Sequence, residues 1–133
     1  MNERPVHFEI HASDPEKLAN FYQQVFGWQI NKWAGGSMEY WLVMTAEKEA
    51  KELGINGGLI RRRGEMPKDG APVNSFVVTM QVADIKKTIT KIEAAGGVCA
   101  LPIFAIPGMA WQAYYKDLDG NIFGIHQPDE KAA

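Results

Sequence analysis

The sequence is poor in cysteine and has no long apolar runs. Its one cysteine, Cys99, cannot form an internal disulfide, and its neighbours Val98 and Ala100 are typical of a small buried strand residue. No apolar run approaches the roughly 18 residues that a membrane span requires, and the first residues lack the charged and apolar regions of a signal peptide. We therefore expect a cytoplasmic protein without a membrane partner.

Surplus positive charge is also absent. The formal net charge is -2 at pH 7, so the chain carries no basic field that would attract nucleic acid. The positive cluster Arg61-Arg62-Arg63 is short and predicts only a solvated strand end or loop. We therefore expect no nucleic-acid binding.

The composition is that of one globular domain. With 133 residues, of which 46% are hydrophobic and 23% charged, the chain can bury a core without disulfide or metal staples. We predict a single domain over residues 1–133. A polar stretch rich in glycine and proline, at about 63–73, predicts a linker between module one, about 4–62, and module two, about 74–128.

Module one begins with a predicted strand over residues 5–11, where apolar and polar side chains alternate. The apolar face would carry Val6, Phe8 and Ile10. The polar face would carry His7, Glu9 and His11. The N-cap candidate Asp14 and the helical spacing that follows predict a helix from about Asp14 to Val25, ended by Gly27. Three further strands are predicted at about 28–33, 38–44 and 57–61.

Module two repeats this order. Residues 75–82 alternate again, with Val77, Thr79 and Gln81 on the polar face, and Asp84 begins a helix that ends at Gly96-Gly97. A strand follows at 98–104. The last two strands, Trp111 to Tyr115 and Ile122 to His126, flank residues 117–121, whose Asp, Gly and Asn suit a hairpin turn.

The two halves indicate an internal duplication. Asp14 and Asp84 each lie thirteen residues before a glycine, Gly27 and Gly97. The order predicts an α+β fold of paired βαβββ modules. We expect the eight strands to form one curved, mostly antiparallel sheet, with the helices outside and the polar strand faces lining a cleft.

Several of these motifs together resemble the vicinal oxygen chelate superfamily, the group of glyoxalases, bleomycin resistance proteins and extradiol dioxygenases. The stretches that carry the resemblance are residues 6–10, 13–14, 21–28, 57–58, 106–108 and 116–121. They span nearly the whole chain and are most similar to small single-chain proteins described as glyoxalase-like. The resemblance implies the paired-module fold and a homodimer.

The resemblance also implies where a divalent metal would be held. His7 falls on the first ligand position, but Val77 and Gly124 stand where two other ligands would be, and residues 57–60 offer no carboxylate, histidine or cysteine. Catalytic metals need roughly three protein ligands. We therefore expect no metal cofactor, and the metal-dependent glyoxalase reaction is disfavoured. An atypical divalent metal site that pairs His7 with Glu9, or His11 with His126, stays open.

The candidate catalytic residues are Glu9, as a base, and His7, as a proton shuttle. The alternative interpretation is structural: His7 would hydrogen-bond to Glu9, Gln81 or a backbone carbonyl, and Glu9 would pair with His7 or Arg61. We expect the ligand-binding cleft to contain His7, Glu9, His11, Thr79, Gln81, Trp111, Tyr114 and His126. Trp111 would lie at the mouth of the cleft, whereas Trp28 would serve packing and the aspartates of the turn would be structural.

Three functions follow. The first is a metal-independent protein that binds a small aromatic or hydrophobic organic molecule in its cleft. The second is an enzyme of the lyase, isomerase or dioxygenase type that uses His7 and Glu9. The third is a dimeric interaction module. The sequence names no substrate, and it leaves open whether the protein is an enzyme.

Overall fold

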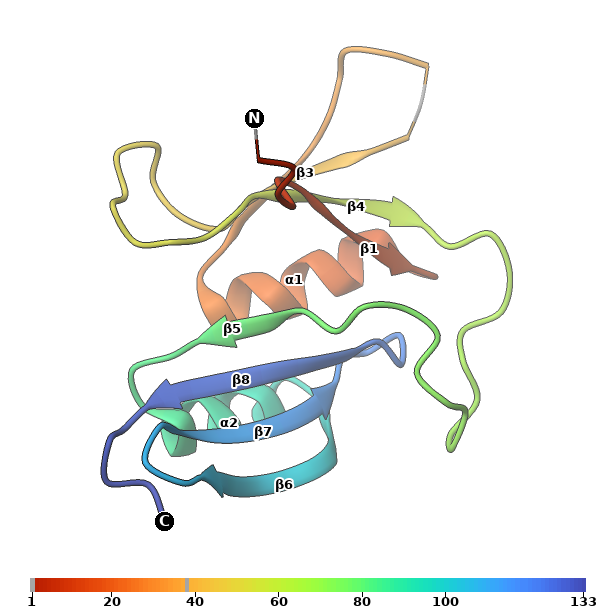
Figure 1. Ribbon diagram of the computed structural model, residues 1–133. Coiled ribbons are helices and arrows are strands. Elements are labelled where there is room, and N and C mark those ends of the chain that lie inside the picture. Colours follow the sequence, from red (N-terminus) through yellow and green to blue (C-terminus); the bar gives the residue numbers. More distant parts are fainter. Residues whose placement is uncertain (1, 38) are drawn as a thin grey trace. The chain divides into compact units, whose positions relative to one another are not determined.

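The computed structural model describes residues 2–37 and 39–133 (Figure 1). The chain divides into two compact units, Met1–Met66 and Pro67–Ala133, and the division falls in the predicted linker. The first unit, module one, contains β1 Phe8–Ala12, α1 Pro15–Phe26, β2 Gln29–Lys32, β3 Trp41–Met44 and β4 Gly57–Arg61. The second, module two, contains β5 Thr79–Gln81, α2 Ile85–Ala94, β6 Val98–Ile106, β7 Ala110–Lys116 and β8 Ile122–Pro128. Met38, part of one predicted strand, lies outside the described residues.

Both helices begin as the sequence predicts. Asp14 and Asp84 adopt extended backbone angles, and their side chains accept hydrogen bonds from the main-chain N–H groups of Lys17 and Lys87, at 3.2 and 3.0 Å. Gly27 ends α1 with a φ of 73°, a left-handed conformation that glycine adopts without strain. Neither helix, among the residues described, is long and apolar enough to cross a membrane.

Each module builds a four-stranded mixed sheet. The strand orders are β1-β4-β3-β2 and β5-β8-β7-β6, so the first and last strands of each βαβββ unit are parallel neighbours and the other pairs are antiparallel. This confirms the α+β class and the paired modules. The strands form two sheets, however, and not the single eight-stranded sheet that we expected. Side-chain alternation predicts which face of a strand is buried, but not whether two edge strands pair.

The core of module one lies between α1 and one face of its sheet. The helix contributes buried Leu18, Phe21, Tyr22 and Val25, and the strands contribute buried Ile30, Trp41, Val43 and Leu59. The Trp28 ring stacks on Tyr22 with ring centroids 5.2 Å apart, which confirms its packing role. In β1, Glu9 and His11 are exposed and Ala12 is buried, so the predicted alternation is confirmed.

In module two, α2 covers the corresponding face. Ile85 and Ile92 of the helix are buried, as are Ala113, Tyr115, Phe123 and Ile125 of the sheet. The side-chain amide oxygen of Gln127 accepts a hydrogen bond from the first helical N–H group, that of Ile85, at 2.8 Å. This bond ties the start of α2 to the same face of β8.

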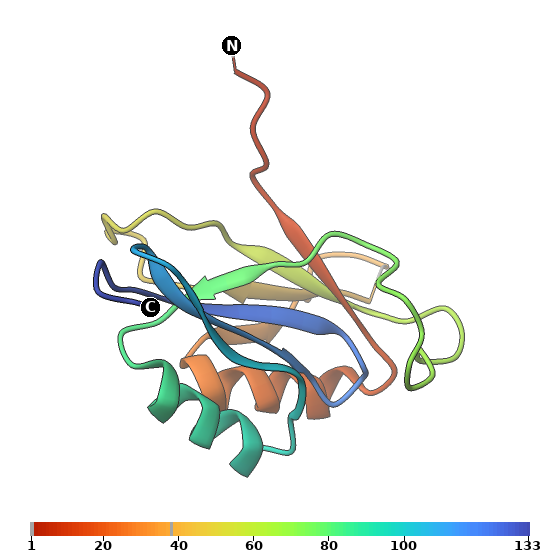
Figure 2. The same ribbon diagram turned by 60° about the horizontal axis from the view of Figure 1, so that its bottom comes forward.

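Three expectations, one about burial and two about strand length, are wrong. Cys99 is exposed, because β6 is the edge strand of its sheet and residues 98–104 are all exposed. The strand predicted over residues 75–82 is shorter, because only Thr79–Gln81 pair with β8, and the preceding Phe76 is 99% exposed. The strand predicted over 5–11 likewise begins only at Phe8, and the residues before it run as an extended segment (Figure 2).

The turn between β7 and β8 is built on Asp117, which is buried. Its carboxylate accepts hydrogen bonds from the N–H groups of Asp119 and Asn121, at 2.8 and 3.0 Å, and from the Asn121 side chain at 2.9 Å. Gly120 takes a φ of 75° in this turn. The structural interpretation of the turn residues is consistent with this geometry.

We expect Asp117→Ala to lower the free energy of unfolding by about 2 kcal/mol, because it leaves N–H donors of the turn without their charged acceptor. Urea unfolding followed by circular dichroism measures the change. Asp69→Ala is the matched control, since the Asp69 side chain is fully exposed and makes only a 3.7 Å surface ion pair with Lys116. Equal stability of the two variants would contradict the role assigned to Asp117.

Candidate functional site

The face of the first sheet that points away from α1 carries the candidate residues of module one. Strand register places Glu9 of β1 beside Gly58 of β4, which in turn lies beside Leu42 of β3. Their neighbours Leu59, Trp41 and Val43 point to the helix and are buried, so Glu9 and Leu42 face the other way and are exposed. His11 lies one pair further along the same face.

Tyr40 lies over Gly58 on this face. Its hydroxyl forms a 2.8 Å hydrogen bond with Nε2 of His7, and the two rings are nearly parallel, at 15°. A Cβ atom at residue 58 would overlap the Tyr40 hydroxyl, so this arrangement requires glycine there. Partial burial and the negative charge of Glu9 raise the pKa of Tyr40 above its ordinary value. His7, Tyr40 and Glu9 therefore form one group.

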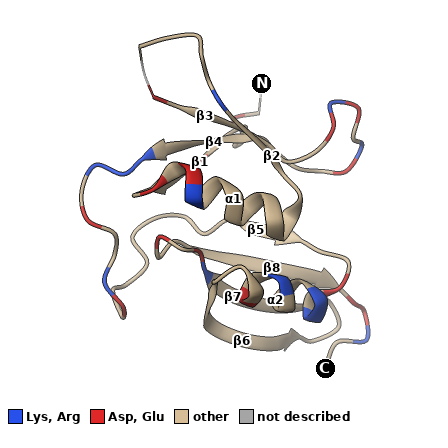
Figure 3. Ribbon diagram, turned by 180° about the vertical axis from the view of Figure 1, so that it is seen from behind, with Lys and Arg blue, Asp and Glu red and all other residues tan. Residues whose placement is uncertain are grey.

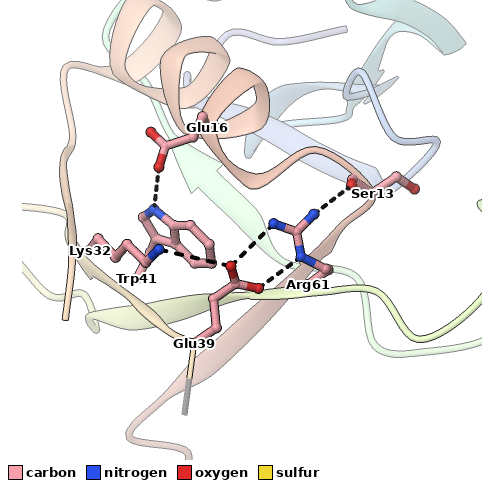
Figure 4. Close-up of polar contacts among 6 residues, drawn as sticks. All are labelled: Ser13, Glu16, Lys32, Glu39, Trp41 and Arg61. Atoms are coloured by element: carbon pink, nitrogen blue, oxygen red, sulfur yellow. Dashed lines mark hydrogen bonds and ion pairs between the residues drawn. The ribbon is translucent and has the colours of Figure 1, made fainter. Parts of the chain in front are cut away.

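The sequence analysis did not identify Tyr40. It suggested Glu9, Gln81 or a backbone carbonyl as the partner of His7, whereas the hydrogen-bond partner in the structure is the Tyr40 hydroxyl. Arg61, one of the two alternative partners suggested for Glu9, donates instead to Glu39 at 2.8 and 3.2 Å (Figure 4). In the sequence, only the paired glycines Gly57 and Gly58 indicated that another side chain packs directly against β4.

The corresponding face of the second sheet carries two cross-strand rows of side chains. In the first row, β5, β8 and β7 contribute Thr79, Gly124 and Tyr114. In the second, they contribute Gln81, His126 and Gln112, and β6 adds Phe104 beside Gln112. The rings of Phe104 and Tyr114 stack at 6.4 Å with an angle of 20°. The structure thus brings together Thr79, Gln81, Tyr114 and His126 of the predicted cleft.

Gln112 is the residue of this face that the sequence analysis missed. It is 4% exposed, and its side-chain oxygen lies 2.8 Å from Nδ1 of His126. With the amide oxygen facing Nδ1, the imidazole donates from Nδ1–H, and its Nε2 is left as a hydrogen-bond acceptor when the ring is neutral. Gln112 therefore fixes the orientation of the His126 ring.

Gly124 leaves room for its polar neighbours. A Cβ atom there would lie 2.5 Å from Oγ1 of Thr79 and 2.8 Å from Nε2 of Gln112. These two side chains would have to move to admit any larger residue, including the glutamate that the family resemblance implies at this position. Neutral hydrogen-bonding groups thus stand where metalloenzymes of that family carry a carboxylate.

Trp111 does not share this face. Successive residues of β7 point to opposite sides, and Trp111 lies beside Gln127, whose side chain reaches the start of α2. Its indole N–H donates to Asp129 at 3.0 Å. Trp111 is therefore on the helix side of the sheet, opposite Tyr114, and not at the mouth of a cleft.

The residues at the implied metal positions do not fit a divalent ion. His7 shares a hydrogen bond with the Tyr40 hydroxyl. The other implied places are Val77, Gly124 of β8 and residues 57–60 of β4, whose side chains have no donor atoms. Over residues 2–37 and 39–133, no three His, Cys, Asp or Glu side chains are grouped closely enough to hold one ion.

Comparisons with known proteins agree with this architecture. The model of the bleomycin resistance protein-like N-terminal family matches residues 4–42. A glyoxylase-like domain-containing protein from Didymella fabae is 28% identical over 118 residues, which are 88% of each chain.

Solved structures share the fold at low sequence identity. A glyoxalase/bleomycin resistance protein/dioxygenase family enzyme from Burkholderia phytofirmans is 18% identical with a TM-score of 0.67, over 91% of this chain and 95% of that one. The fosfomycin resistance protein FosX from Listeria monocytogenes is 16% identical with a TM-score of 0.69, over 96% and 94%. The match extends over both modules.

We expect Gly58→Ala to displace the Tyr40 ring and break its hydrogen bond to His7, at a cost of about 1–3 kcal/mol in the free energy of unfolding. The pKa of Tyr40 should then fall toward its ordinary value as the ring moves into water. Urea unfolding and the absorbance of tyrosinate during alkaline titration measure the two effects.

The matched control is Gly54→Ala, because no atom lies within 4 Å of a Cβ placed there. Its stability should stay within about 0.5 kcal/mol of the parent protein. A Gly58→Ala variant with the stability and tyrosine titration of the parent would refute the contact.

Proposed function

We propose, on the premise that this chain is a glyoxalase- and bleomycin-resistance-like protein of the vicinal oxygen chelate superfamily, that it binds a small aromatic organic molecule without a metal ion. The binding surface is the face of the second sheet that points away from α2. The observation that carries the proposal is the neutral polar set Thr79, Gln112 and His126 around Gly124, next to the stacked rings of Phe104 and Tyr114.

The aromatic pair favours a flat ligand. Phe104 is 37% exposed and Tyr114 is half-buried, so a ligand ring can cover apolar surface that the module itself leaves in water. Stacked or tilted aromatic pairs contribute about 0.5–1.5 kcal/mol beyond the burial of area. An aliphatic ligand would gain the free energy of burying apolar area, but not this contribution from an aromatic pair.

The polar row favours a ligand that donates a hydrogen bond. Nε2 of neutral His126 is an acceptor, because Nδ1–H is used at Gln112. A phenolic O–H next to the aromatic ring would supply the missing donor. The face contains no charged side chain in these two rows, so a neutral phenol suits it better than a carboxylate.

The test uses 1-naphthol, which has both features, and 1-methoxynaphthalene, which has the ring but no O–H donor. We expect the parent protein to bind 1-naphthol. The affinity should fall about tenfold when either hydrogen-bonding partner is removed, the O–H group of the ligand or the His126 side chain, because one hydrogen bond is worth about 1.4 kcal/mol at such a site. Isothermal titration calorimetry measures the affinities of the parent, His126→Ala and Tyr114→Ala.

Trp111→Phe is the matched control, since Trp111 lies on the opposite face of the same strand. It should bind 1-naphthol as the parent does. Equal affinities for the two naphthalenes, or a loss of binding in Trp111→Phe as large as that in Tyr114→Ala, would refute the proposed surface.

A second candidate function rests on module one. His7, Tyr40 and Glu9 form a group that could move a proton, as a lyase or isomerase requires, and groups with a perturbed pKa, such as Tyr40, are often found at functional sites. In this function Glu9 is the base. An atypical divalent metal site would be the alternative version, in which the reaction also uses a metal ion. Homodimer formation stays a prediction in either case.

The effect of the Glu9 charge on the pKa of Tyr40 can be measured directly. We expect Glu9→Gln to lower the pKa of Tyr40, because the carboxylate that disfavours tyrosinate is removed. Alkaline titration of tyrosinate absorbance detects the change, and Glu47→Gln, at an exposed residue, is the control. Inductively coupled plasma mass spectrometry of untagged protein measures bound metal. An unchanged titration together with stoichiometric metal would contradict the metal-free arrangement of this group.

A further inference from the structure

Gly124 of β8 lies at the bottom of a narrow gap between side chains of the second sheet. A Cβ atom at residue 124 would lie 2.5 Å from Oγ1 of Thr79, 2.8 Å from Nε2 of Gln112 and 3.2 Å from Cε1 of Tyr114. These side chains come from β5 and β7, the strands on either side of β8. They border one point above the Gly124 main chain, and we call this space the Gly124 gap.

The side-chain amino group of Gln112 is an unpaired donor at the gap. Gln112 is 4% exposed, and its amide oxygen is already used at Nδ1 of His126. Its Nε2 has no hydrogen-bond partner among residues 2–37 and 39–133. Within the same part of the chain, every fully buried side-chain nitrogen or oxygen does have a partner. The unpaired Nε2 therefore reaches solvent, although the rest of the side chain is buried.

Thr79 supplies a second donor. It lies on β5, an edge strand of the sheet, and is exposed. Its hydroxyl likewise has no hydrogen-bond partner in the described chain, and it can rotate to donate to an atom beside it. Two unpaired donors, one from each strand next to β8, thus converge on the Gly124 gap.

The distances around the gap distinguish a carbon atom from an oxygen atom. A carbon at the Cβ position would overlap both polar atoms, at 2.5 and 2.8 Å. An acceptor oxygen, by contrast, normally lies about 2.5–3.0 Å from a hydroxyl donor and about 2.7–3.2 Å from an N–H donor. A ligand oxygen would stand further out than a Cβ atom, because it is not bonded to Gly124. It would still lie between the two donors, since they also keep van der Waals distance from that main chain.

The strands around the gap carry little charge. β5, β6 and β8 contain no Lys, Arg, Asp or Glu, and β7 contains only Lys116, which forms an ion pair with Asp69 at 3.7 Å (Figure 3). A carboxylate would lose hydration here without gaining a free cation, whereas a neutral carbonyl needs only the two donors. The Tyr114 ring, which borders the gap, stacks on Phe104. The group that carries the carbonyl would therefore meet an aromatic surface.

We propose that the Gly124 gap is a subsite for the carbonyl oxygen of an aryl ketone. The oxygen accepts hydrogen bonds from the Thr79 hydroxyl and the Gln112 amino group, and the aromatic ring of the ligand lies against Tyr114 and Phe104. This inference rests on the proposed function, because the ring uses the same aromatic surface, and it adds a hydrogen-bond acceptor to the class of ligand.

The experiment compares 1-acetylnaphthalene with 1-ethylnaphthalene, which has a similar shape but no ketone oxygen. Isothermal titration calorimetry of the full-length protein measures both affinities. We expect the ketone to bind about tenfold more tightly, because its oxygen meets two unpaired donors. Thr79→Val keeps the shape of the side chain but removes the hydroxyl, so it should reduce this preference about fivefold. Gly124→Ala places a methyl group in the gap and should abolish the preference.

Thr90→Val is the matched control, since it removes the same kind of hydroxyl from α2, where Thr90 is exposed and donates to the main-chain oxygen of Lys86. It should leave the preference for the ketone unchanged. The affinity for 1-naphthol, measured in every variant, reports whether the face is intact.

Neither naphthalene of this pair has an O–H group, so the comparison does not depend on His126. Equal affinities for the ketone and the ethyl compound, with 1-naphthol still bound, would overturn the carbonyl subsite and leave the proposed function standing. A preference for the ketone that Thr79→Val and Thr90→Val reduce equally would also overturn it. A ketone preference that only Thr79→Val reduces, together with equal binding of 1-naphthol and 1-methoxynaphthalene, would support the subsite and refute the hydrogen bond to His126.

Discussion

In each module the first and last strands pair in parallel, at a position where the last strand carries a glycine, and the rest of the module depends on this pairing. In module one, β1 and β4 align Glu9 with Gly58, and in module two, β5 and β8 align Thr79 with Gly124. Because each glycine lacks a Cβ atom, a side chain from a neighbouring segment can lie directly against the sheet there: Tyr40 lies over Gly58, and Gln112 lies over Gly124. The duplication visible in the sequence therefore reappears as a duplicated local arrangement of the candidate sites.

This arrangement supports the proposed binding of a neutral organic molecule. Val77 and Gly124 stand at two of the places where the family resemblance implies metal ligands, and hydroxyl and amide groups lie over Gly58 and Gly124. Such groups recognise hydrogen-bonding partners without a large electrostatic field, so they suit neutral organic molecules. The charged network of module one lies elsewhere, at the end of β4, where Arg61 donates to Glu39.

The sequence predicted more of the fold than of the site. The aspartate N-caps, the glycine after α1, β4 and the β7–β8 turn are local features that depend on residues close in sequence, and all are present. The side-chain partners were harder to predict. His7 and Tyr40 are separated by 33 residues, and nothing in the spacing of either residue points to the other. Trp111 and Tyr114 were expected on one face, although alternation along β7 places residues three apart on opposite faces, as the structure shows.

By itself, the sequence determined the order of elements, the duplication and the faces of β1, because each depends on residue type and on periodicity along the chain. Only the tertiary structure decided that the strands form two sheets, that Cys99 is exposed on an edge strand, and that Gln112 orients His126. These features depend on which distant segments become neighbours, and that is settled by the packing and hydrogen bonding of the whole module.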